Sequence, residues 1–148
     1  MIRQFIPQEV CLKCKGCCRF SQEDSVWVPR LLKEEEGVLS EIRVIPSQEG
    51  NNFICSFFNP EDNHCKIYAE RPFECQLYPF LLKKKSGKIF LGLDLNCPFT
   101  KGKIETKEFS EYLNYLIGLL KSQQYAAILK SNPQVIQGYP EAEELSAL

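Results

Sequence analysis

The stretch CLKCKGCC, residues 11–18, holds four of the eight cysteines of this chain. A Cys-x-x-Cys loop can bring two sulfur atoms to one metal ion, because its turn points both side chains to the same side. Here the loop occurs twice and shares Cys14, so that Cys11, Cys14 and Cys17 are spaced three residues apart. This spacing predicts that the three thiols serve one metal centre, and Gly16 lets the backbone fold tightly between them.

Bacterial ferredoxins hold three corners of an iron–sulfur cubane with the same cysteine spacing. Cys97, which precedes Pro98, is placed like the remote ferredoxin ligand. A mononuclear zinc ion would instead use two of the three cysteines. Cys18 departs from the ferredoxin run. Because adjacent side chains point apart, we expect Cys17 and Cys18 not to share one mononuclear metal.

Cys55, Cys65 and Cys75 are separated from one another by nine residues each, with turn signals between them. Together with Cys18 they could complete a second tetrahedral thiolate site. For any one of these three, or for Cys97, the alternative is a thiol that packs as a small buried hydrophobe. The sequence therefore predicts eight metal ligands in one or two sites: Cys11, Cys14, Cys17, Cys18, Cys55, Cys65, Cys75 and Cys97.

Composition places the chain among soluble globular proteins. It has 148 residues, 44% hydrophobic and 25% charged, and a net charge of -1. This balance makes a nucleic-acid partner unlikely and gives no sign of an acidic disordered tail. No secretory signal and no run long enough to span a bilayer is seen, so we expect a cytoplasmic protein whose thiols stay reduced and bind metal. A mature secreted chain with four disulfides is the alternative.

The predicted fold class is α+β, a small irregular metal-centred domain with short strands or a β-hairpin and a helical C-terminal part. We expect a single domain over 1–148, in which a helical tail (106–148) packs on the cysteine-cluster region (11–98). Strands are predicted at 26–28, 41–46 and 52–58, a hairpin at 76–82 and 88–95, and helices at 29–37, 65–70, 106–120, 123–130 and near Pro140.

The motif at 11–18, together with CKIYAERPFECQLYPF (65–80) and the later Cys97-Pro98, resembles the CxxCxxCC or YkgJ-like cysteine-cluster family. Members are described as zinc- or iron-chelating domains, and a similar domain occurs in flagellin lysine methylases. The resemblance covers about residues 11–98 and implies metal chelation by the cysteines.

Several other side chains have two interpretations each. Arg71 either donates to thiolates or caps the turn before Pro72. Tyr68 and Tyr78 are better explained as core residues than as hydrogen-bond donors to the metal site. His64, the only histidine, is expected in an exposed turn rather than as a ligand. Lys83–Lys85, with Lys88, are expected to form a solvated hairpin tip rather than a nucleic-acid contact.

Three functions remain open at this point. The first is a redox or electron-transfer module built on an iron–sulfur cluster. The second is a structural zinc module that binds a protein partner. The third is an accessory domain related to the lysine methylases, although no cofactor loop, paired acids or nucleophile motif supports catalysis. The expected cofactor is thus an iron–sulfur cluster or zinc.

Overall fold

The computed structural model describes residues 1–14 and 16–148. In chain order its elements are α1 (Gln8–Lys13), β1 (Arg19–Phe20), β2 (Val44–Pro46), β3 (Phe53–Cys55), β4 (Phe58–Asn59), β5 (His64–Cys65), η1 (Tyr68–Glu70), α2 (Phe73–Leu77), β6 (Phe80–Lys85), β7 (Lys88–Leu93), α3 (Pro98–Lys101), α4 (Lys107–Leu120), α5 (Gln123–Ser131), η2 (Pro133–Val135) and β8 (Glu143–Ala147).

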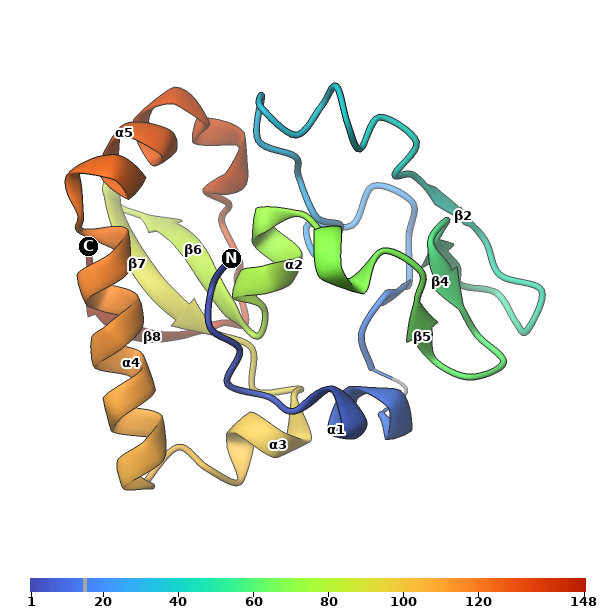
Figure 1. Cartoon of the computed structure of the whole chain (residues 1–148), viewed down its shortest axis with the longest axis horizontal. Coiled ribbons are helices and arrows are strands. Elements are labelled where there is room, and N and C mark those ends of the chain that lie inside the picture. The colour runs from blue at the N-terminus through green and yellow to red at the C-terminus, as the bar shows by residue number, and fades with distance from the viewer. Residues whose placement is uncertain (15) are drawn as a thin grey trace.

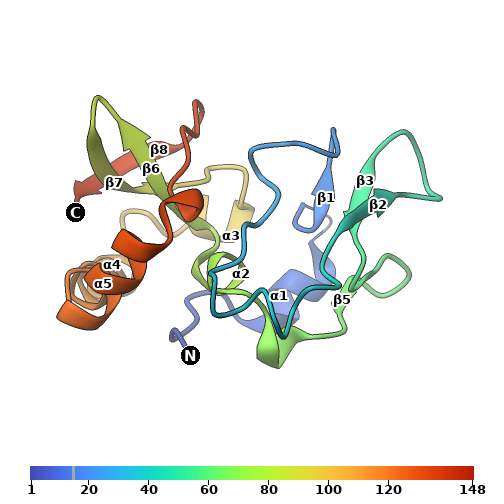
Figure 2. The same cartoon turned by 90° about the horizontal axis from the view of Figure 1, so that it is seen from above.

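The described strands form small antiparallel sheets, ordered β1-β3-β2, β4-β5 and β6-β7-β8. Figures 1 and 2 show the sheet of β6, β7 and β8 at one end with α4 and α5 on one of its faces, and strands β1–β5 at the other end. We call the first part the sheet lobe (73–148) and the second the cysteine lobe (8–70). The mixed, irregular α+β class expected from the sequence is confirmed.

Helix α4 supplies much of the core. The side chain of Thr106 accepts a hydrogen bond from the backbone N–H of Phe109 at 3.3 Å, as expected of an N-cap. The apolar stripe of α4 is buried against residues from both lobes. The core consists of Ile2, Leu32, Phe73, Leu77, Phe80, Leu82, Leu91, Leu93, Phe109, Tyr112, Leu116, Leu120, Leu129 and Val135. No helix in the described part of the chain is both long and apolar enough to cross a bilayer.

The short helix α2 connects the core to the cysteines. Phe73 and Leu77 lie four residues apart on one face and are buried in the core. Cys75 lies between them in sequence and therefore on the other side of the helix. The carboxylate of Glu35 accepts a hydrogen bond from the backbone N–H of Phe73 at 2.7 Å. Core packing thus fixes the direction in which Cys75 points.

The predicted strand at 26–28 and helix at 29–37 are wrong, because residues 26–28 form a turn and bend, residues 29–32 are irregular and residues 33–37 form turns. In the second segment, the Glu35 carboxylate accepts from the backbone N–H of Leu32 at 2.8 Å, and the turns that follow do not extend into a helix. Trp27 packs its ring on Tyr139, with centroids 5.2 Å apart. Tertiary contacts therefore outweigh the local preferences of these residues.

The hairpin is confirmed, but β6 begins at Phe80, because Gln76 and Leu77 belong to α2. The helices of 106–130 are also confirmed. The helix expected near Pro140 is wrong. Residues Glu143–Ala147 form β8, which pairs with β7 along the edge of the sheet.

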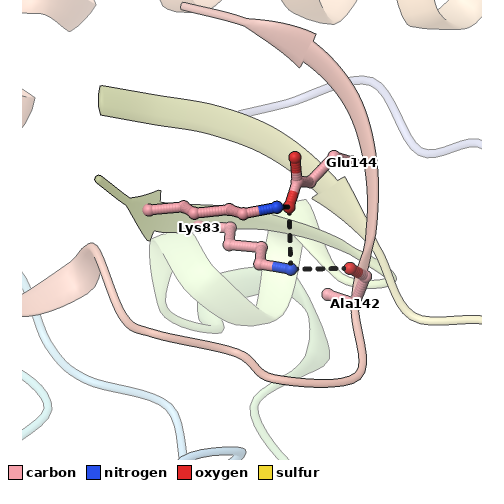
Figure 3. A network of polar contacts seen from close by, with 4 residues as sticks. Lys83, Ala142 and Glu144 are labelled. Carbon is pink, nitrogen blue, oxygen red and sulfur yellow. Dashed lines mark hydrogen bonds and ion pairs between the residues drawn. The ribbon is translucent and has the colours of Figure 1, made fainter. Parts of the chain in front are cut away.

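The C-terminal segment corrects the interpretation of the lysine cluster. Gln137 forms an isolated β-bridge with Lys83 of β6. The chain then crosses to β7, where Ala142 and Lys83 both lie beside Gly92. Lys83 is only 9% exposed, and its Nζ donates to the carbonyl of Ala142 at 3.0 Å and pairs with Glu144 at 3.2 Å (Figure 3). Lys85 pairs with the same carboxylate at 2.8 Å. Lys83 is therefore a buried docking residue for β8, not part of an exposed basic tip.

This network predicts a pH-dependent contribution of Glu144 to stability. Hydrogen bonds from Lys85 and Lys83 lower its pKa below the usual 4.5. A carboxyl whose pKa is lower in the folded than in the unfolded chain stabilises the fold. This stabilisation is fully present at a pH above the pKa in the unfolded chain, and it is lost as the pH falls through the pKa in the folded chain. Glu144→Gln should therefore lower the Tm by a few degrees at neutral pH and by nothing in strong acid, measured by thermal melts across pH.

Glu143→Gln is the matched control, because the neighbouring Glu143 is exposed and belongs to no ion pair among the described residues. It should leave the melting profile unchanged at every pH. An equal effect of the two substitutions would contradict the role given to Glu144.

Candidate metal centre

A single cavity of about 460 Å³ collects every cysteine of the chain. Cys97 is buried and the others are partly exposed. The cavity lies where the two lobes meet, since its walls include Trp27 from one lobe and Tyr139 from the other. The cysteines that line it are Cys11, Cys14, Cys17, Cys18, Cys55, Cys65, Cys75 and Cys97.

Four of these thiols come from the N-terminal segment around α1 and from the loop between β7 and α3. Cys11 lies on α1, and the backbone N–H of Cys14 closes the helix by donating to the carbonyl of Cys11 at 3.1 Å. Cys97 directly precedes α3, and Thr100 donates its hydroxyl to the Cys97 sulfur at 3.3 Å. Burial raises the pKa of Cys11, with further increases from Cys97 and Cys14. We call Cys11, Cys14, Cys17 and Cys97 the first group.

The remaining four thiols are brought together by short strands and by α2. The backbone N–H of Cys55 donates to the carbonyl of Cys18 at 3.2 Å, and Phe58 pairs with Cys65 across β4 and β5. Burial raises the pKa of Cys75 well above its usual value, followed by the charges of Cys18, Cys55 and Cys65. These contacts define the second group: Cys18, Cys55, Cys65 and Cys75.

The two groups adjoin at Cys17 and Cys18. Burial first, and then the neighbouring thiols, raise the pKa of each to about 12. Cys18 adopts a left-handed backbone conformation, with φ of 60°. For a residue other than glycine this conformation stores strain of roughly 1–3 kcal/mol, and such residues concentrate at functional sites. After burial, the largest thiol influence on the pKa of Cys17 comes from Cys18, followed by Cys11 and Cys14. The pKa of Cys18 is raised most by Cys55 and Cys65, and less by Cys11.

The thiols are gathered but are not in contact with a common point. Among residues 1–14 and 16–148, no three His, Cys, Asp or Glu side chains form a ready-made ion site. Thiolate-bound zinc needs sulfur atoms at about 2.3 Å, so binding would have to draw the thiols of a group inward. The donor set fits zinc and iron–sulfur clusters, both of which prefer soft thiolates. A bound cation would also reverse the mutual pKa increases, because it stabilises the thiolates.

Polar residues in the cavity wall add hydrogen bonds that the sequence did not reveal. The hydroxyl of Tyr78 donates to the carboxylate of Asp94 at 2.8 Å, and the Tyr78 side chain also opposes part of the increase in the pKa of Cys17. Asp94 is only 6% exposed. Tyr78 therefore faces the thiols rather than serving only as a core residue. The position of Asp94, three residues before Cys97, was the available sequence signal.

Two arginines also line the cavity, Arg19 and Arg71. The positive charge of Arg71 lowers the pKa of Cys11, and that of Arg19 lowers the pKa of Cys18, although burial dominates both thiols. No hydrogen bond from the Arg71 guanidinium to a turn carbonyl occurs in the described part of the chain. Arg19, directly after Cys18, was missed from the sequence. His64 lies partly buried on β5 and outside the cavity wall.

One relative, the uncharacterized protein MJ0661 of Methanocaldococcus jannaschii, is 26% identical over 102 residues, which is 57% of this chain and 52% of that protein. The chain thus spans about half the length of that relative. No solved structure shows a significant match.

A family model matches residues 10–98, which include all eight cysteines and more than half of the chain. The family is described as a "Putative zinc- or iron-chelating domain". The resemblance expected from the cysteine motifs is confirmed: the chain belongs to the CxxCxxCC family of zinc- or iron-chelating domains.

Proposed function

We propose that this protein holds two thiolate-bound metal centres, one in each group of four cysteines. The observation that carries the proposal is the gathering of eight thiols around one cavity, in which thiols of the same group raise one another's pKa and the two groups adjoin at Cys17 and Cys18. Four cysteines complete the coordination of a tetrahedral zinc ion or of one iron–sulfur cluster.

For the first group we propose an iron–sulfur cluster with an electron-transfer role. Its three N-terminal cysteines have the ferredoxin spacing, and Cys97 precedes Pro98. Cys11 and Cys14 are partly exposed, so a cluster there would lie near the surface, where a redox partner protein can approach. The bound cluster would supply one-electron chemistry, and the chain would supply ligands, burial and hydrogen bonds.

For the second group we propose structural zinc. Cys55, Cys65 and Cys75 lie on β3, β5 and α2, and Cys18 directly precedes β1. These strands are only two or three residues long, so their pairing alone holds the segments together weakly. A tetrahedral ion with four protein ligands has no open position for chemistry, and its binding energy goes into folding. The same centre would stabilise the surface that the cysteine lobe presents to a protein partner.

Anaerobic preparation followed by elemental analysis tests both assignments. Brown protein with broad visible absorbance, four iron atoms and one zinc per chain is the expected result. Colourless protein with two zinc ions would overturn the redox role and retain the two-centre arrangement. Protein with neither metal after anaerobic preparation would overturn the proposed function. The preparation must exclude oxygen, because oxygen strips clusters and lets zinc replace iron.

A further inference from the structure

Two arginines of the cysteine cavity wall stack on aromatic rings. Arg71 stacks on Tyr68, with its Cζ 3.8 Å from the ring centroid, and Arg19 stacks on Phe58 at 4.6 Å. Both side chains line the cavity. An arginine on an aromatic face is held in one plane, and its N–H groups point outward from the ring edge.

Each arginine keeps a buried donor without a partner. Nη1 of Arg19 and Nε of Arg71 are shielded from solvent and donate no hydrogen bond among the described residues. Buried N–H groups are nearly always satisfied, and an unpaired donor on a charged group is especially unfavourable. Neither arginine belongs to an ion pair in residues 1–14 and 16–148. The thiolates of the same cavity are anionic acceptors of the kind that these donors lack.

The charges of the two arginines act on thiols of different groups. The Arg71 charge acts on Cys11, and the Arg19 charge acts on Cys18. Arg19 is fixed further by Asn63, whose Oδ1 accepts from Nη2 at 2.9 Å and whose Nδ2 donates to the carbonyl of Leu12 at 3.1 Å. A centre with four thiolates carries a net charge of about −2 when it holds one divalent ion. One guanidinium per centre halves that charge.

We propose that Arg71 and Arg19 are positioning residues that donate N–H groups to the metal-bound sulfur atoms, Arg71 in the first group and Arg19 in the second. The inference rests on the proposed function, because the acceptors are thiolates of the two centres. Partners of this kind orient the ligands and reduce repulsion between them. Their loss typically weakens metal binding about 10–100-fold.

Zinc serves as the probe in the test, because it suits both groups of thiols. The Zn²⁺ affinity of the full chain is measured by competition with a chromophoric chelator, in two backgrounds. Cys18→Ser leaves the first group intact, and Cys17→Ser leaves the second. In the Cys18→Ser background, Arg71→Gln should weaken Zn²⁺ binding about 10–100-fold, whereas Arg19→Gln should leave it unchanged. In the Cys17→Ser background, Arg19→Gln should weaken Zn²⁺ binding and Arg71→Gln should leave it unchanged.

Conservative variants and a matched arginine separate this role from a general loss of folding. Arg71→Lys and Arg19→Lys keep the charge and should recover part of the affinity. Arg3→Gln is the control: Arg3 also stacks on an aromatic ring, Tyr115, at 4.6 Å, but does not line the cysteine cavity. Equal weakening of both centres by either substitution, or unchanged affinity in both, would overturn the inference. Absence of zinc binding by the unaltered protein would instead overturn the proposed function.

Discussion

Removal of metal should unfold the cysteine lobe and leave α4 helical. The lobe has strands of two or three residues and contributes few side chains to the core, so thiolate–metal bonds replace the missing apolar burial. Structural zinc supplies on the order of 10 kcal/mol of folding free energy in small domains. The sheet lobe has its own apolar core around Leu116 and Leu91, both fully buried. We therefore expect partial rather than complete unfolding.

The lone tryptophan allows this prediction to be measured. Trp27 lines the cysteine cavity and stacks on Tyr139 of the sheet lobe. After chelation its fluorescence should shift to the red and lose its cooperative thermal transition, while far-ultraviolet circular dichroism retains the α4 signal. Added metal should restore the transition, and mild acid should mimic chelation, because protons compete for thiolates. Identical melting curves with and without metal would refute the prediction.

Serine substitutions at the adjacent cysteines should empty different centres. The two residues meet at the boundary of the groups: apart from Cys18, the thiols that raise the pKa of Cys17 are Cys11 and Cys14, whereas those with the largest effect on Cys18 are Cys55 and Cys65. Cys18, the first residue of the second group along the chain, has a left-handed backbone conformation. Cys17→Ser should therefore lose the metal of the first group and keep that of the second, and Cys18→Ser should do the opposite. Elemental analysis should find one centre remaining in each variant.

Double substitutions make this test internally controlled. Cys17→Ser combined with Cys97→Ser removes two ligands of one group, so it should lose no more metal than Cys17→Ser alone. Cys17→Ser combined with Cys75→Ser removes one ligand from each group and should lose both centres. If every single substitution empties the whole protein, one multinuclear cluster or one shared folding unit explains the cavity better than two centres.

Local sequence was sufficient for features that depend on near neighbours. The spacing at 11–18, the N-cap Thr106 and the apolar stripe of α4 identified the metal-binding motif and the main helix. These signals are reliable because a Cys-x-x-Cys turn and an amphipathic helix are specified within a few residues. The α+β class and the membership of the CxxCxxCC family followed from the same short patterns.

Tertiary structure alone decided how distant residues meet. Lys83 is a polar residue in a lysine run, yet it is buried because residues 137–147 return across the sheet and add β8. Residues 29–37 have a helical pattern, but the Glu35 carboxylate serves the start of α2 instead. The same folding places Arg19 and Arg71 against the cysteine groups. Such pairings depend on the packing of segments far apart in the chain, and no local propensity encodes them.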